Sequence, residues 1–138
     1  MIDAGTEAGA RATRRLEKER IIWITTVQHD GTPQSSPVWF LWDGSEFLIY
    51  SQPNRPKLRN IQRNRRVALN LNSNETGGDI LTLSGEARID PEASSAKDNP
   101  DYMGKYRTAV VGGGWTPESF AADYSVAVRV RPDSARVW

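Results

Sequence analysis

The sequence contains no cysteine and a single histidine, His29, among its 138 residues. The absence of cysteine excludes disulfide bonds, thiolate nucleophiles, cysteine-ligated zinc and iron–sulfur clusters. One histidine cannot build a multi-histidine metal site within a chain. A Ser-His-Asp triad would need His29, which stands beside the turn sequence Asp30-Gly31, where histidines are usually solvated. We therefore predict no metal site, and we expect a bound cofactor to supply any chemistry.

The sequence also lacks long apolar runs and an excess of one charge. Its longest apolar run, Val38–Trp42, is far shorter than the roughly 20 residues of a membrane-spanning helix. The first 20 residues lack the apolar centre of a secretory signal, so we expect a cytoplasmic protein without a membrane segment. With 18 Lys and Arg against 17 Asp and Glu, the net charge is only +1, which argues against a general nucleic-acid partner.

Length and composition fit one globular domain over residues 1–138, because a single domain typically holds roughly 100–200 residues. Residues 1–20 are interpreted as an N-terminal helical extension. Its helix is predicted over Glu7–Arg20, with Ala8, Ala12 and Leu16 forming one narrow apolar stripe. The preceding segment, Met1–Thr6, is expected to fray.

Three strands are predicted in the first half of the chain. Ile21–Val27 is rich in β-branched and aromatic residues, Pro33–Trp42 alternates between two faces, and Glu46–Ser51 follows. Because the turn sequences Asp30-Gly31 and Asp43-Gly44 separate these segments, we predict a three-stranded meander.

The second half is predicted to add three strands and three short helices. The strands cover Arg66–Asn72, Asp79–Ile89 and Ser125–Arg131, and the helices cover Lys57–Asn64, Asp101–Thr108 and Pro117–Asp123. Gly85, inside a strand, indicates a bulge or a tight bend. The segment Val111–Trp115 is interpreted as flexible, either a lid over a pocket or an ordinary surface loop. Thr116 is the expected N-cap of the last helix.

Six alternating strands with few helices favour a mainly β fold. A closed antiparallel barrel is the preferred arrangement, because closure removes exposed sheet edges. The alternative is an open sheet with helices on one face.

A local concentration of positive charge is the most informative feature of the sequence. The segment Asn54–Arg66 holds six cations and no acid, although the whole chain is nearly neutral. It coincides with a predicted helix start at Pro56 and Lys57, and a helix N-terminus offers free N–H groups to phosphate. Ser51 can add a hydroxyl donor. A phosphate or polyanion site is one interpretation, and a solvated basic helix face is the other.

A second candidate feature is the strand that carries Pro33 and Pro37. Neither proline can donate a ladder hydrogen bond, so this strand is predicted to be an edge strand or locally unpaired. Unpaired backbone groups beside aromatic side chains can bind the edge of a flat heterocycle. The alternative is that Val38, Phe40 and Trp42 are simply core residues.

The order and spacing of several short segments resemble a known family. These segments are Arg15-Leu16, Ile24–Val27, Asp30–Pro33, Ser36–Phe40, Trp42–Gly44, Lys57–Ile61 with Asn64, Tyr124–Val126 and Arg129–Pro132. The chain resembles the pyridoxamine-phosphate-oxidase-like split β-barrel flavoproteins. Within them it is similar to the small actinobacterial oxidoreductases that use the deazaflavin coenzyme F420 in place of FMN. The resemblance implies a six-stranded antiparallel split barrel of the FMN-binding type.

The same resemblance implies a homodimer with two cofactor sites at the subunit interface. It assigns the cofactor phosphate to Lys57, Arg55 and Ser51, and it assigns to Asn60 the support of the phosphate-binding helix. The backbone around Ser35, Ser36, Pro37, Val38 and Trp39 would line the ring system. Two segments of the partner subunit would close the pocket, namely the loop with Gly77 and Gly78 and the segment from Tyr106 to Trp115.

Ser35 and Ser36 stand where the related pyridoxamine phosphate oxidases carry basic residues, which argues against oxidation of pyridoxamine phosphate. The resemblance instead implies hydride transfer from reduced F420 to a small electrophilic molecule, such as an activated alkene or a quinone-like acceptor. Tyr106 is a candidate proton donor. The alternatives are an FMN-binding reductase or oxidase and a non-catalytic F420 or flavin carrier. A small barrel that binds single-stranded nucleic acid is a further alternative, which the near-zero net charge disfavours.

Overall fold

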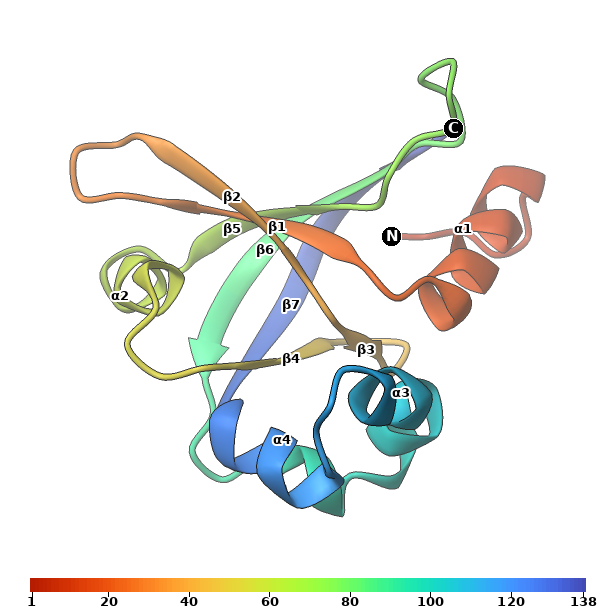
Figure 1. The fold of residues 1–138 in the computed structure, drawn as a ribbon. Helices are drawn as coiled ribbons and strands as arrows, with labels where there is room; N and C mark the ends of the chain where they lie inside the picture. The colour runs from red at the N-terminus through yellow and green to blue at the C-terminus, as the bar shows by residue number, and fades with distance from the viewer.

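The structure is a computed structural model that describes residues 1–138. A curled antiparallel sheet of seven strands carries helices at its open sides (Figure 1). The helices are α1 (Glu7–Lys18), α2 (Pro56–Arg63), η1 (Ala96–Asp98), α3 (Pro100–Gly112) and α4 (Pro117–Asp123). The strands are β1 (Ile22–Val27), β2 (Pro33–Val38), β3 (Leu41–Trp42), β4 (Phe47–Ser51), β5 (Arg66–Asn70), β6 (Leu81–Ile89) and β7 (Val126–Val137).

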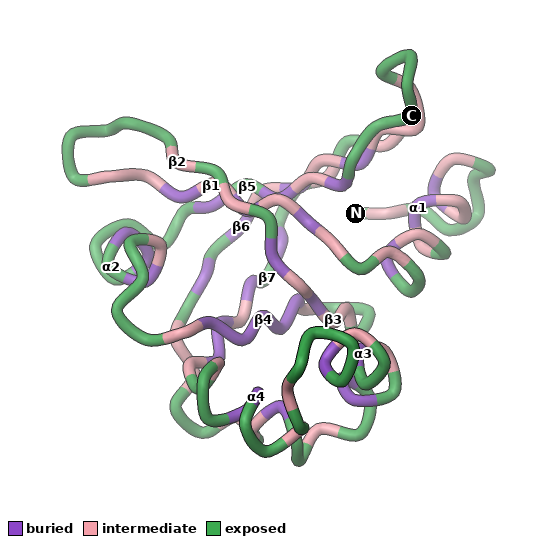
Figure 2. The backbone as a smooth tube through the Cα atoms, viewed as in Figure 1, coloured by how far each residue is buried: buried purple, intermediate pink, exposed green.

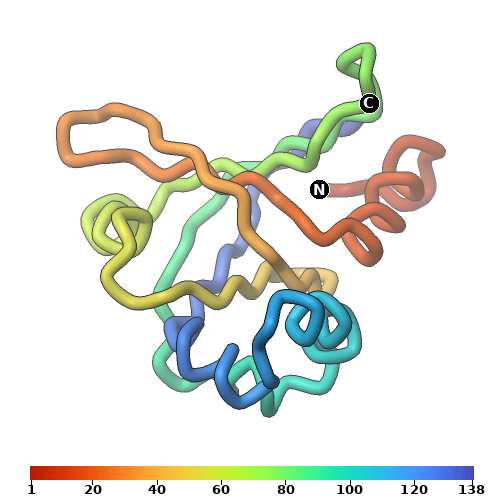
Figure 3. The backbone as a smooth tube through the Cα atoms, in the orientation of Figure 1, coloured from red at the N-terminus to blue at the C-terminus, as the bar shows by residue number.

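The strand order is β2-β1-β5-β6-β7-β4-β3. The strands β2 and β3 stand at opposite ends of this order, although only Trp39 and Phe40 separate them in the chain. The sheet therefore curls until its two edges meet at this bend (Figure 3). The split-barrel fold is confirmed, with the barrel open between β2 and β3 rather than closed by hydrogen bonds.

Two predictions for the first half of the chain are wrong. The predicted strand Pro33–Trp42 is two strands, so the sheet has seven strands instead of six. The predicted three-stranded meander is instead two separate hairpins, β1-β2 and β3-β4, which lie at opposite ends of the strand order. The position of β2 at a sheet edge is confirmed, and its prolines explain it, since they cannot donate to a further strand.

The bulge predicted at Gly85 is confirmed. The register between β6 and β7 shifts between Ser84 and Gly85. A Cβ atom at Gly85 would lie 2.1 Å from the carbonyl oxygen of Arg131, so only glycine lets the two backbones approach this closely. The bulge bends β6, and this bend helps the sheet to curl.

Two hydrophobic cores share strand β4. The first core fills the barrel and includes Leu16, Phe47 and Ile49. The second core lies between the sheet and the helices α3 and α4, and it includes Leu48 and Tyr50. Every residue of β4 is therefore buried (Figure 2).

The helices differ from the prediction in length. Helix α3 extends to Gly112, so the start of the predicted flexible segment Val111–Trp115 is helical, and the backbone N–H of Trp115 donates to Val110 O at 3.1 Å. Thr116 caps α4 as predicted, in a capping box with Ser119.

The N-terminal segment forms a turn before α1. The carbonyl oxygen of Asp3 accepts hydrogen bonds from the backbone N–H and the hydroxyl of Thr6, and Ile2 packs against the barrel core. Helix α1 ends at Lys18, two residues before the predicted end at Arg20. None of the helices has the length and apolarity that a bilayer crossing requires.

Candidate functional site

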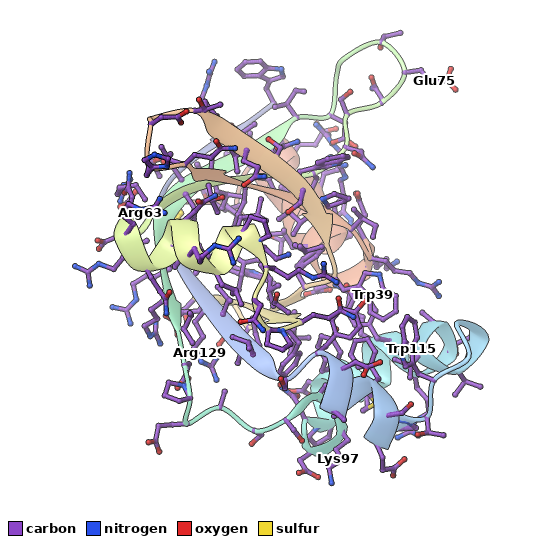
Figure 4. All side chains as sticks on the ribbon, turned by 60° about the vertical axis from the view of Figure 1, so that its left-hand side comes forward. Trp39, Arg63, Glu75, Lys97, Trp115 and Arg129 are labelled. Atoms are coloured by element: carbon purple, nitrogen blue, oxygen red, sulfur yellow. The ribbon has the colours of Figure 1, made fainter.

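A cavity of about 340 Å³ lies where the edge strand β2, the end of β4 and the start of α2 face the helices α3 and α4. This volume is within the range of small-molecule and cofactor sites. The residues that line it are Ile21, Pro37, Val38, Trp39, Tyr50, Ser51, Gln52, Arg55, Lys57, Tyr102, Trp115, Phe120 and Tyr124. Two of the labelled side chains in Figure 4, Trp39 and Trp115, belong to this wall.

The polar end of the cavity is built where β4 ends and α2 begins. Ser51 is 2% exposed, and its hydroxyl donates to the carbonyl oxygen of Gln52 at 2.8 Å. Arg55 occupies the N-cap position of α2 but makes no side-chain capping bond to the helix. Its guanidinium instead donates to the side chain of Gln52. The first turn of α2 contains no acidic residue, so its positive end is not neutralised locally.

Lys57 is half-buried in this cavity wall and has no acidic partner. Burial lowers the pKa of its ammonium group, and the nearby Arg55 guanidinium lowers that pKa further. Burying a cation costs free energy when no counterion replaces the water that surrounded it. An anion at this end of the cavity would relieve that cost, and the uncapped helix start would add N–H donors. The residues present therefore fit a phosphate group.

Asn60 ties helix α2 to the β1–β2 hairpin from behind the cavity. Its side chain is 4% exposed, and its amide nitrogen donates to Thr26 Oγ1 and to Gln34 Oε1, both at 2.9 Å. These two bonds fix α2 against β1 and β2. Asn60 therefore holds the helix in place without lining the cavity.

The basic segment divides into three parts in the structure. Arg55 and Lys57 line the cavity, whereas Arg66 forms an ion pair with Asp133 of β7. The remaining arginines of this segment form no ion pair and lie outside the cavity; they are Arg59, Arg63 and Arg65. Figure 4 shows Arg63 on α2.

The predicted residues of strand β2 and of the bend after it also fall into two groups. Pro37, Val38 and Trp39 line the cavity. Ser35 is exposed, and its hydroxyl lies 2.7 Å from the Thr25 hydroxyl, on the sheet surface. Ser36 is half-buried and is not part of the cavity wall.

Gly77 and Gly78 lie in the loop between β5 and β6, where Asn74 Oδ1 accepts the backbone N–H of Gly78 at 2.7 Å. This loop projects from the opposite end of the molecule to α4 (Figure 1), and neither glycine lines the cavity of its own chain. The resemblance assigns these glycines to a partner's site, so their role remains a prediction.

Tyr106 lies directly behind the cavity wall. Its ring stacks on Trp39 with centroids 4.8 Å apart and planes 6° apart. Its hydroxyl lies 2.6 Å from Arg20 O and accepts the backbone N–H of Phe40 at 2.9 Å. Burial raises the pKa of this hydroxyl. The structure thus gives Tyr106 the role of holding Trp39 and the bend after β2.

The aromatic half of the cavity includes residues that the sequence did not identify. Tyr50 and Tyr124 line it together with Tyr102, Trp115 and Phe120. Phe120 stacks on Tyr124 with centroids 4.6 Å apart and on Trp39 with centroids 5.5 Å apart. The spacing of Phe120 and Tyr124, four residues apart at the end of a helix, is the one signal that could have linked them.

Both the sequence and the fold of this chain match those of known proteins. The family model described as pyridoxamine 5'-phosphate oxidase matches residues 9–138 of this chain. The structure of an F420 reductase is 27% identical in sequence, with 89% of this chain and 94% of that chain covered and a TM-score of 0.68.

Two more distant structures show the same fold. A putative pyridoxamine 5'-phosphate oxidase from Listeria innocua is 20% identical, with 93% and 95% covered and a TM-score of 0.67. The heme storage protein HutZ from Vibrio cholerae is 16% identical, with 96% and 95% covered and a TM-score of 0.67.

Proposed function

The chain belongs to the pyridoxamine 5'-phosphate oxidase family, and on this premise we propose that it is an oxidoreductase that uses the deazaflavin coenzyme F420. In this proposal the coenzyme binds along the cavity beside β2. When bound and reduced, it supplies a hydride to a small electrophilic substrate.

A half-buried lysine without an acidic partner, at the start of an uncapped helix, is the observation that carries this proposal. Lys57, with Arg55 and Ser51, forms the cationic end of a cavity whose other walls are aromatic. A phosphate at the cationic end would anchor the coenzyme, and the flat rings beyond it suit a planar heterocycle.

Two observations favour F420 over FMN. The chain is 27% identical to an F420 reductase. In addition, Arg59, Arg63 and Arg65 lie outside the cavity without ion pairs, and F420 carries a tail of carboxylates that such cations can bind. FMN, with a single phosphate, needs fewer cations. FMN binding remains the alternative cofactor assignment.

The chain's own residues would bind, orient and shield the reacting groups. Hydride transfer depends on alignment more than on protein acids and bases. This requirement agrees with a chain that has no cysteine and one histidine. Asn60 would keep the phosphate-binding helix in register with β2, and Tyr106 would keep Trp39 in the wall.

Replacing Lys57 by alanine tests the assignment of the phosphate. We expect the variant to bind F420 more weakly by about 1–3 kcal/mol, the range for a lost charged hydrogen bond. Titration of the coenzyme's fluorescence with protein measures this loss. Lys97→Ala is the matched control, because Lys97 is exposed and lies outside the cavity.

Equal affinities of Lys57→Ala and the native chain for F420 would contradict the phosphate assignment. Tight binding of FMN, together with no binding of F420, would replace the proposed coenzyme by FMN. Binding of F420 without turnover of a broad set of electrophilic acceptors would indicate the carrier alternative.

A further inference from the structure

Tyr102, on α3, has the one buried side-chain oxygen or nitrogen in the structure that lacks a hydrogen-bond partner. The residue is 0% exposed. It stands between Tyr50 and Tyr106, and its ring centroid lies 4.8 Å from each of theirs. The two flanking hydroxyls are satisfied: Tyr50 donates to Ser94 O at 2.8 Å, and Tyr106 bonds the backbone around Phe40.

An unpaired buried hydroxyl destabilises a fold, because the group has lost its hydrogen bonds to water and forms none within the protein. A phenylalanine at position 102 would pack the same ring without that cost. The hydroxyl of Tyr102 therefore needs an explanation beyond packing, and a partner from outside the chain supplies one.

Tyr102 belongs to the wall of the cavity, so a compound that binds in the cavity would lie next to it. The neighbouring wall is formed by flat rings. Trp39 and Phe120 are 19° from parallel, and Tyr102 and Phe120 are 25° from parallel. Burial raises the pKa of Tyr102, so the hydroxyl keeps its proton and acts as a donor. This half of the cavity contains no charged side chain, unlike the half around Lys57.

We infer that the aromatic half of the cavity binds a planar conjugated compound that bears a carbonyl group, and that the Tyr102 hydroxyl donates a hydrogen bond to its carbonyl oxygen. The inference rests on the proposed function for one point only, namely that this compound is the electrophilic substrate. A hydrogen bond to the carbonyl oxygen would both select such compounds and withdraw electron density from the conjugated system. Tyr102 keeps its proton throughout.

Equilibrium dialysis of two matched compounds against coenzyme-free protein tests this inference. The first is 2-methyl-1,4-naphthoquinone, and the second is 2-methylnaphthalene, which has a similar shape but no carbonyl. The absence of cysteine excludes thiol addition to the quinone. We expect Tyr102→Phe to weaken binding of the quinone roughly two- to tenfold, the effect of one neutral hydrogen bond, and to leave binding of the hydrocarbon unchanged.

Thermal unfolding without ligand provides an independent measurement. Tyr102→Phe should unfold at the same temperature as the native chain or higher, because it removes an unpaired polar group. Tyr106→Phe, the matched change at a hydroxyl that is hydrogen-bonded, should unfold at a lower temperature. A loss of stability in Tyr102→Phe as large as in Tyr106→Phe would show that a bound water already satisfies Tyr102, and it would overturn the inference.

An unchanged affinity of Tyr102→Phe for the quinone, or an equal loss for both compounds, would also overturn the inference. The result is separable from the coenzyme assignment. A chain that does not bind F420 but keeps the Tyr102-dependent preference for the quinone would refute the proposed function alone. A chain that binds F420 through Lys57 without that preference would refute the inference alone.

Discussion

Trp39 keeps its place in the cavity wall because helix α3 holds it from behind. Tyr106 stacks on its ring, and the next residue, Phe40, is bound through its backbone by both Tyr106 and Lys105. The Lys105 ammonium donates to Phe40 O at 2.9 Å and lies 3.7 Å from the centre of the Phe40 ring. Two residues of one helix thus fix the bend at which the barrel opens.

Lys105 should make the stability of the protein depend on pH. Burial lowers the pKa of Lys105 to about 8 in the folded chain, from 10.5. Between these values the unfolded chain binds a proton that the folded chain has released, so stability rises with pH in this window. We expect the unfolding temperature of the native chain to rise more steeply from pH 7.5 to about pH 9.5 than that of Lys105→Met. If the unfolding temperatures of the two proteins rise equally with pH, Lys105 does not titrate in this pH range.

The charged half of the site follows from a local sequence pattern, whereas the support by Asn60 is predicted only through the resemblance. Lys57 and Arg55 stand in a run of cations at a helix start, and that local pattern predicts an anion site without knowledge of the fold. The roles of Asn60 and Tyr50 depend on which strands become neighbours. No local pattern contains that information.

At the scale of elements, β4 illustrates why the strand pairing escaped prediction. A strand with one buried face alternates in polarity, but β4 is buried on both faces, between the barrel core and the helices α3 and α4. One of its partners, β3, directly precedes it in the chain, whereas the other, β7, is the last strand. The turn at Asp43-Gly44 correctly predicts the β3-β4 hairpin. It carries no information about β2, which lies at the opposite edge of the sheet.

The bulge between β6 and β7 is predicted to tolerate no side chain. Gly85→Ala would place a Cβ against the backbone of Arg131, and the two paired strands cannot move apart without breaking their ladder. We expect a loss of about 1–3 kcal/mol in the free energy of unfolding, measured with urea. Gly104→Ala is the control: Gly104 is exposed in α3 with no atom within 4 Å of the added Cβ, so helix propensity should make it more stable. Similar stability of Gly85→Ala and the native chain would contradict the close approach.

At the scale of the whole molecule, the cavity joins two chemically different halves. One half is cationic and is set by the start of α2, and the other is aromatic and is set by α3 and α4. We propose, from the resemblance, that two chains pair with their sites at the interface. In such a pair the loop with Gly77 and Gly78, which is remote from the cavity of its own chain, would close the site of the partner.

A crystal structure of the protein soaked with F420 is the most direct test of the central claim. We predict the phosphate of the coenzyme within hydrogen-bond distance of the Lys57 ammonium group, at the start of α2, and its ring against β2 near Trp39. We also predict two chains in the assembly, with the partner's Gly77–Gly78 loop over the site. Coenzyme bound away from Lys57, or a site that takes up FMN and leaves F420 in solution, would contradict the account.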